Sequence, residues 1–308
     1  MASLLNKRSI SWIKFSVAGL LIAWWVSYIQ PSRIIVVWQQ VNVTYLFLAG
    51  GLGVLGLLLQ WLKWYILIRY ENPILNPLHA LDSIFVGFAL GMVSPGRLGE
   101  LARGLFLPGD KKKWIALAAI DRGTSFGVTM AFGMVVSLWI APTWLVMVGF
   151  AGLAVGALIL WCLRGKTKYI WKTLPNKVWY QLIMWSTLFN LLFFCQFYFL
   201  LHAWIPPSAK VALAIPLVFA IKGALPISFM DMGIREGAAV WLLGPLGVVP
   251  AVAFNAAFTL FLINVLIPGS GGAMLLLKRL GGLDTQGING IKKRLSVMAK
   301  YELKPVNN

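Results

Sequence analysis

Carboxylates are scarce in this chain, because only nine of its 308 residues are Asp or Glu while 27 are Lys or Arg. Charged residues of both signs make up 12% of the chain, whereas soluble domains carry about a quarter. Hydrophobic residues make up 59%. So few charges in so apolar a chain exclude an ordinary soluble domain and predict an all-helical, polytopic membrane protein.

The basic excess of +18 would also fit a nucleic-acid-binding protein, were it not for its distribution. Almost all of it lies in short segments that flank apolar runs. This is the positive-inside pattern of a membrane protein. We therefore expect the membrane, and not nucleic acid, as the partner of these charges.

Cysteine and histidine are also rare, with two residues of each. Cys162 and Cys195 fall inside apolar runs, which favours a packing role. His79 and His202 have no Cys or second His at metal-ligand spacing, so no metal site is expected. The sequence lacks a GxxxxGK[ST] loop, which excludes an ATP motor of that type. No cofactor is expected.

Six apolar runs reach the roughly 20 residues that a transmembrane helix needs. They are residues 10–29, 44–68, 115–140, 144–163, 178–201 and 251–277. The first imitates a signal peptide, but no cleavage site follows it, and we interpret it as a retained span.

Two further pairs of apolar arms are shorter and are interrupted by Gly, Pro and charge. They are residues 79–93 with 97–107, and residues 211–225 with 234–249. Lys63 and Lys111 flank the first pair, and the positive-inside rule puts both on the cytoplasmic side. The first pair must then enter and leave the membrane on one side, as a re-entrant hairpin.

The same rule places the basic cluster between Arg164 and Lys177 inside, so the second hairpin enters from outside. The chain would form one transmembrane domain, residues 1–280, with inverted halves at about 44–140 and 178–277. A basic tail, 281–308, would follow, and both termini would be cytoplasmic. Interrupted segments at corresponding places in two inverted halves point to a transporter's binding site.

Both hairpin tips carry Pro, Gly, Arg and Glu, in SPGRLGE and PISFMDMGIREG. Ser94 before Pro95 predicts the N-cap of a returning helix, whose free N–H groups attract anions. Arginine can grip a phosphate in two places. The candidate substrate-binding residues are Ser94, Arg97, Glu100, Arg103, Arg122, Arg235 and Glu236, with Asp121, Ser228 and Asp231 in support and no catalytic residue.

Structural roles stay open for several of these groups. The charges could pair with one another and only pin the hairpins, and Arg122 could pair with its neighbour Asp121. Arg103 and Lys222 could reach an interface. The polar residues Asn190, Gln196, Asn255 and Asn264 are expected to form hydrogen bonds between helices.

Four stretches, GFALGMVSPGRLGELARGLFL, IDRGTSF, LPISFMDMGIREGAAVWLL and GSGGAMLLL, resemble the membrane domain shared by bacterial lysylphosphatidylglycerol synthases and small standalone flippase-like proteins. The resemblance extends from about Asn42 to Leu277. It implies a protein of the bacterial cytoplasmic membrane that moves a lipid between leaflets. The segment after Leu277 is too short for the soluble transferase domain of the bifunctional members, so lipid synthesis is not expected. The family commonly has Glu-Arg where this chain has Asp121-Arg122, and a glycine-rich turn in place of FMDMG.

The expected function is therefore to bind and translocate a lipid with an anionic, phosphate-containing headgroup. The alternative is a membrane-embedded transferase, or an accessory subunit, that acts on polyprenyl-phosphate-linked sugars. A scaffold for a lipid-modifying complex would give no reason for arginines at two tips. The sequence leaves open a homo-oligomer and a partner lipid-modifying enzyme.

Overall fold

The computed structural model describes residues 16, 19–94, 97–140, 174–225 and 232–281. Every element in these residues is helical, which confirms the predicted all-helical class. Four helices are long and apolar enough to cross a membrane. They are α3 (Val43–Glu71), α5 (Lys111–Ile140), α7 (Asn176–His202) and the stretch Pro250–Lys278. This last stretch combines α10 (Pro250–Phe261), a π-helical turn η3 (Leu262–Leu266) and most of α11 (Ile267–Gly281).

These four helices coincide with four of the six predicted spans. The first predicted span is described from Gly19 as the helix Gly19–Ile29, which meets α2 (Pro31–Gln39) at an angle of 76°. Gln30 at the bend has a φ of 75°, a left-handed conformation that interrupts a right-handed helix. The bent pair would make a fifth span if it crosses the membrane as one unit. The predicted span 144–163 lies outside the described residues.

Polar caps fix where the helices begin. The side chain of Asn42 accepts a hydrogen bond from the N–H of Thr44 (3.0 Å), and Asn76 does the same for Leu78 (2.9 Å). Ser208 accepts from Val211 (3.4 Å) at the start of α8. Side-chain oxygens at these positions satisfy N–H groups that have no partner within a helix.

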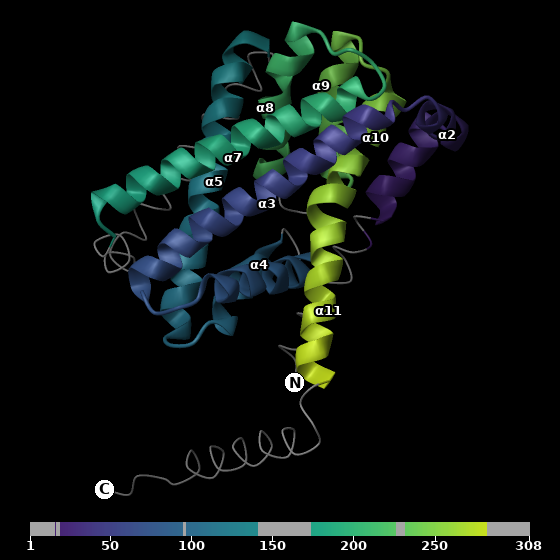
Figure 1. Cartoon of the computed structure of the whole chain (residues 1–308). Helices are drawn as coiled ribbons and strands as arrows, with labels where there is room; N and C mark the ends of the chain where they lie inside the picture. The colour runs from purple at the N-terminus through teal and green to yellow at the C-terminus, as the bar shows by residue number, and fades with distance from the viewer. Residues whose placement is uncertain (1–15, 17–18, 95–96, 141–173, 226–231, 282–308) are drawn as a thin grey trace, which may run out of the picture.

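Short helices fill the intervals between the long ones (Figure 1). α4 (Pro77–Met92) and the 3₁₀ helix η1 (Leu98–Phe106) lie between α3 and α5 in the chain. α8 (Ala209–Ala224), α9 (Ile234–Leu243) and the 3₁₀ turn η2 (Gly244–Leu246) lie between α7 and α10. In each set the two main arms pack against one another, α4 on η1 and α8 on α9. The predicted pairs of short arms are therefore present.

Each of the two sets packs against a long helix from the other part of the chain. α3 and α7 run side by side (Figure 1), α4 packs against α11, and α8 packs against α5. A glycine permits each of the latter two crossings. A Cβ at Gly272 of α11 would overlap the carbonyl of Phe85 and touch Ala89.

The matching glycine on the other side is Gly133 of α5. A Cβ there would overlap the Cβ of Ala220 and approach the carbonyl oxygen of Pro216 to 3.4 Å. The contacted residues are four apart in both cases, which is one helical turn. The two crossings are thus built from the same local arrangement.

Candidate functional site

The returning arm η1 aligns three charged residues in a row. Arg97, Glu100 and Arg103 are spaced by three, and a 3₁₀ helix has three residues per turn, so Glu100 and Arg103 lie on one face of η1. The sequence predicted a helix here, and Arg97 directly precedes its first residue. Glu100 and Arg103 are buried at 3% exposure each.

The predicted N-cap role of Ser94 is wrong in position. The helix begins at Leu98, and its N-cap is Arg97, with a φ of 56°. The Ser94 hydroxyl instead accepts a hydrogen bond from the N–H of Gly99 (2.6 Å) and donates to the carbonyl of Gly91 (3.2 Å). A Cβ at Gly99 would overlap the Leu90 carbonyl. This close approach of η1 to α4 puts the Gly99 N–H within reach of Ser94.

Glu100 holds two arginines at once. Its Oε1 forms an ion pair with Arg97, and its Oε2 forms one with Arg122 of α5. Arg122 therefore does not pair with its neighbour Asp121, which was one of the alternatives. Consecutive residues of an α-helix point about 100° apart, so Arg122 and Asp121 face different neighbours.

Asp121 also holds two cations. Its Oδ1 lies 3.1 Å from the Nζ of Lys63, and its Oδ2 pairs with Arg103. The Arg103 guanidinium lies 4.0 Å from the ring centroid of Trp64, a cation–π contact. The expectation that Arg103 could reach an interface is wrong, because it is enclosed by Trp64 and Asp121.

Lys63 is the functional candidate that the sequence reasoning missed, since it was interpreted as a marker of the cytoplasmic side. Its side chain is 3% exposed. Its ammonium donates to the Asp121 carbonyl (3.0 Å), to Ser125 and to Ser186 (3.2 Å). The available signal was its place inside the apolar run of α3, two turns before the helix ends. An ionisable residue at that depth is a functional candidate by default.

The second returning arm, α9, uses its own charged pair. Gly233, with a φ of 82°, is its N-cap, and its N–H donates to Glu236 Oε2 (2.7 Å). Arg235 Nη2 lies 2.5 Å from Glu236 Oε1, and the guanidinium lies 5.5 Å from the ring centroid of Phe261. Because the N-cap is Gly233, neither Ser228 nor Asp231 occupies that position; both lie outside the described residues.

The two arms correspond by position, although differently from the sequence match. Arg97 and Gly233 are both N-caps with positive φ, and Glu100 and Glu236 are each the third residue of their helix. Arg235 therefore corresponds to Gly99 and not to Arg97. Each arm carries a buried Glu as the third residue of its helix. Its Arg partner within the arm is the N-cap residue in the first arm and the second helical residue in the second arm.

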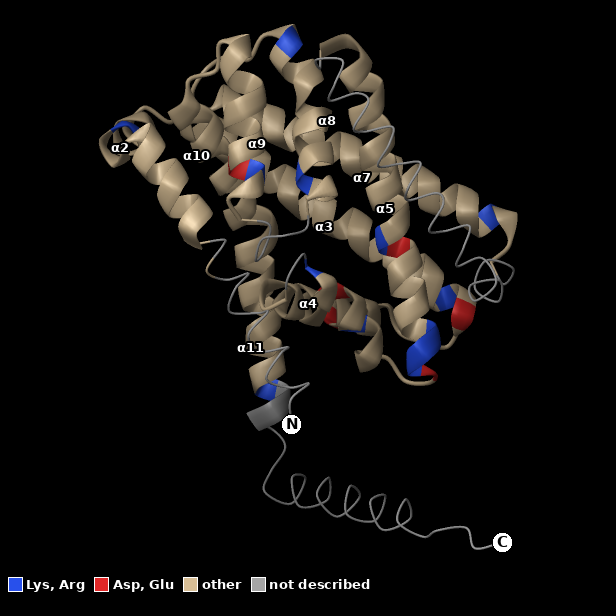
Figure 2. Cartoon of the chain, turned by 180° about the vertical axis from the view of Figure 1, so that it is seen from behind, with Lys and Arg blue, Asp and Glu red and all other residues tan. Residues whose placement is uncertain are grey.

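A cavity of about 480 Å³ lies between the two arms. Among the described residues, no carboxylate lines it. Four cationic side chains do: Arg97, Arg122, Lys222 and Arg235. Neutral polar groups complete the lining, namely Gln60, Ser125, Thr129, Asn190 and Asn264. Most other residues of the helices are uncharged, as the tan ribbon in Figure 2 shows.

Every long helix contributes to this cavity near its middle. Gln60 comes from α3, Phe189 and Phe193 from α7, and Asn264 from η3. The π-helical turn at η3 precedes Pro268, which has no N–H to donate to the Asn264 carbonyl. Such turns frequently occur at functional sites.

The four polar residues expected to join helices do so. Asn190 accepts from Thr129 (2.5 Å), Gln196 donates to the Ala49 carbonyl (2.9 Å), and Asn264 donates to Gln196 (2.8 Å). Asn255 donates to the Ile34 carbonyl (3.2 Å). Asn190 and Asn264 also line the cavity, so they have a second surface available to a ligand.

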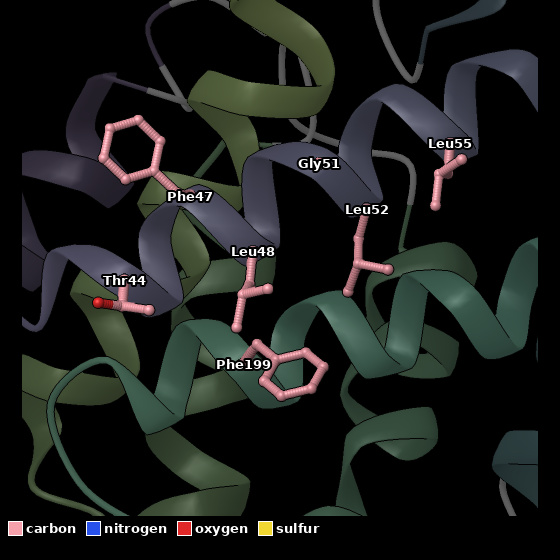
Figure 3. A pocket seen from close by; sticks show the side chains of 7 residues that line it. All are labelled: Thr44, Phe47, Leu48, Gly51, Leu52, Leu55 and Phe199. Carbon is pink, nitrogen blue, oxygen red and sulfur yellow. The ribbon is translucent and has the colours of Figure 1, made fainter.

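A second hollow lies along α3 and α7 (Figure 3) and differs in chemistry. Its lining is apolar except for one hydroxyl: Thr44, Phe47, Leu48, Gly51, Leu52, Leu55 and Phe199. It offers no charged group to a headgroup. Within the described residues no group of three or more His, Cys, Asp or Glu is placed to hold a metal ion.

The family model of the lysylphosphatidylglycerol synthase TM region matches residues 11–272. The chain belongs to the lysylphosphatidylglycerol synthase TM family. The match includes every described residue of the cavity and of both returning arms. No curated protein matches the sequence of this family member. The family relates it to lipid modification or translocation in membranes.

Proposed function

We propose that the protein binds a lipid with an anionic, phosphate-containing headgroup in this cavity and moves it across the bilayer. The observation that supports this proposal most directly is the lining of the cavity, in which three arginines and a lysine face a common space. Arginine forks bind phosphate bidentately. Charged groups at membrane depth are costly to maintain, which favours a functional role for them.

The proposal includes two re-entrant hairpins, α4 with η1 and α8 with α9, inserted from opposite sides. α4 has 16 residues and α9 has ten, and a helix needs about 20 to cross. The matching crossings at Gly133 and Gly272 and the matching Glu100 and Glu236 support an inverted repeat. Both termini would lie in the cytoplasm, at a bacterial cytoplasmic membrane.

The lipid tail would stay in the bilayer while the headgroup enters the cavity. Leu98 and Phe126 both line the cavity, yet 63% and 48% of their surfaces are exposed. Apolar side chains that are both exposed and at the rim suit an opening toward lipid rather than toward water.

Individual roles follow from the contacts. Arg97, Arg122 and Arg235 would bind the headgroup, while Glu100 and Glu236 orient them. Arg103, Asp121 and Ser94 would fix the first arm from behind the cavity. Supporting roles for Ser228 and Asp231 stay predictions. The proposal includes transport without lipid synthesis and requires no cofactor.

A leaflet-resolved transport assay tests the proposal. The protein is reconstituted into vesicles with tail-labelled phosphatidylglycerol or phosphatidate, and a quencher that cannot cross the membrane reports the outer leaflet. Arg97→Gln and Arg235→Gln should each slow movement tenfold or more. Arg33→Gln, an exposed arginine of α2, is the matched control. Unchanged transport in both cavity variants, with normal insertion, would overturn the proposal.

The transferase alternative makes a different demand. It needs a carboxylate free to act on the substrate, whereas Glu100, Asp121 and Glu236 each pair with one or two cations. Incubation of the purified protein with a labelled polyprenyl-phosphate-linked sugar separates the two. Formation of a product by the chain alone would reject pure transport.

A further inference from the structure

Four cations share two carboxylates where η1 meets α3 and α5. Glu100 bridges Arg97 and Arg122 with its two oxygens, and Asp121 bridges Lys63 and Arg103 with its own. We call these six residues the η1 network. Each carboxylate oxygen lies within ion-pair distance of one cation, and four positive against two negative formal charges leave an excess of two.

Little solvent screens the excess, and the part of it carried by Arg97 and Arg122 lies at the cavity wall. The side chains of Glu100, Arg103, Asp121 and Lys63 are no more than 5% exposed. Arg97 and Arg122, at 14% and 34%, are the members that line the cavity. Uncompensated charge away from water is strongly unfavourable unless a ligand supplies the opposite charge.

On the opposite wall of the cavity, α9 adds no net negative charge that could offset this excess. Arg235 is balanced one to one by Glu236, so this pair adds no net charge while its guanidinium still lines the cavity. Lys222 of α8 also lines the cavity and adds no negative charge. Among the described residues, a ligand between the walls therefore meets the formal excess of two positive charges of the η1 network, and no carboxylate lines the cavity to offset it.

We infer that the cavity selects a headgroup that ends in a phosphomonoester, which carries about two negative charges at pH 7, or in a diphosphate, which carries more. This inference rests on the proposed function, because the ligand occupies the same cavity. A terminal phosphate has three free oxygens, enough for arginines on both walls. A phosphodiester such as phosphatidylglycerol has two free oxygens and one charge, and it leaves one excess positive charge unpaired.

The shared chemistry has several sources, which a binding experiment separates. Purified full-length protein in nanodiscs is titrated with phosphatidate, with phosphatidylglycerol of the same acyl chains, with farnesyl phosphate and with glycerol 3-phosphate. Phosphatidate or farnesyl phosphate should bind at least tenfold more tightly than phosphatidylglycerol. If phosphatidate binds more tightly than farnesyl phosphate, the natural ligand has acyl tails, and if farnesyl phosphate binds more tightly, it has a prenyl tail. This comparison uses the wild-type protein and does not depend on a variant that folds poorly.

A variant then assigns the preference to the network. Arg122→Gln lowers the excess from two charges to one, so the preference for phosphatidate over phosphatidylglycerol should fall by tenfold or more. Arg33→Gln should leave the preference unchanged. Equal affinity of phosphatidate, farnesyl phosphate and phosphatidylglycerol for the wild-type protein would overturn the inference while the proposed function stands. If glycerol 3-phosphate bound as tightly as phosphatidate, the lipid tail would not contribute to binding. That result would reject a lipid ligand and, with it, the proposed function.

Discussion

Arg122 of α5 forms an ion pair with Glu100 of η1, and this pair joins the returning arm of the first hairpin to a long helix. The two residues belong to different helices, and their separation in the sequence is much longer than one helical turn. The fold therefore brings them together. The side chain of Glu100 is buried and also pairs with Arg97. One carboxylate therefore determines the position of two arginines that line the cavity.

Removal of this carboxylate should be costly. Glu100→Gln leaves Arg97 and Arg122 without their counter-charge, and a broken buried pair costs roughly 3 kcal/mol. The free energy of unfolding, measured by SDS titration in mixed micelles, should fall by about this amount. The cost of Arg122→Gln should be smaller, because a third of its side chain is exposed to solvent.

A double-mutant cycle over Glu100→Gln and Arg122→Gln isolates the pair. We expect a coupling energy of about 1 to 2 kcal/mol, as for residues in direct contact within one network. Effects that add to within about 0.5 kcal/mol would mean that the two residues do not interact.

Lys63→Met tests the second bridged carboxylate. The change removes an ammonium that contacts Asp121, Ser125 and Ser186, and leaves Asp121 with one cation. The free energy of unfolding should fall by about 3 to 5 kcal/mol. Lys210→Met, at an exposed lysine of α8, should change it by no more than about 0.5 kcal/mol. A Lys63 variant as stable as the control would place Lys63 at a wet interface, where the sequence analysis had put it.

The long helices could be predicted from the sequence because one physical requirement determines them. A bilayer core demands about 20 apolar residues with their backbone groups bonded internally, and α3, α5 and α7 satisfy this by length and hydropathy alone. Asn42 and Asn76 even mark where helices begin. The short arms could also be predicted from length, since their apolar runs are interrupted by Pro, Gly and charge before they reach the length of a span.

The pairing of the charges could not be predicted in this way. Arg122 was weighed against its sequence neighbour Asp121, but the partner that it takes is Glu100. Which carboxylate pairs with which arginine depends on the 3₁₀ geometry of η1 and on how closely Gly99 approaches α4. Both are tertiary properties. Lys63 was misplaced for a related reason, because charge at a helix end and charge inside a bundle look alike in a sequence.

Gly133→Ala and Gly272→Ala test whether the two halves use the same crossing. In each variant the added Cβ would overlap a neighbouring helix, at Ala220 and at the Phe85 carbonyl respectively. Overpacking of this kind costs about 1 to 3 kcal/mol, and we expect both variants to lose stability by similar amounts in the SDS titration.

Gly50→Ala is the matched control for both variants. Nothing lies within 4 Å of a Cβ at Gly50 of α3, and alanine favours a helix over glycine by up to about 1 kcal/mol. This variant should be neutral or more stable than the wild type. If only one of Gly133 and Gly272 proves sensitive, the packing of the two halves is not equivalent.

The opposed insertion of the hairpins can be tested by labelling with a maleimide that cannot cross the membrane. The background variant carries Ser in place of Cys162 and Cys195. Single cysteines are then introduced at exposed positions beside each hairpin. Ile74, 94% exposed, precedes α4, and Lys112 follows η1. Both Ile74→Cys and Lys112→Cys should react only from the cytoplasmic side, in inverted vesicles.

The second hairpin should give the opposite result. Lys210 in the first turn of α8 and Val249 after η2 are exposed positions at the two ends of this hairpin, and cysteines there should react only in right-side-out vesicles or intact cells. The decisive comparison is within each pair. A helix pair that crossed the membrane once would bring its two flanking cysteines to opposite sides, since an odd number of crossings exchanges the compartments. Labelling of Ile74→Cys and Lys112→Cys from different sides would therefore rule out a re-entrant α4–η1 hairpin, whatever the stability of the variants.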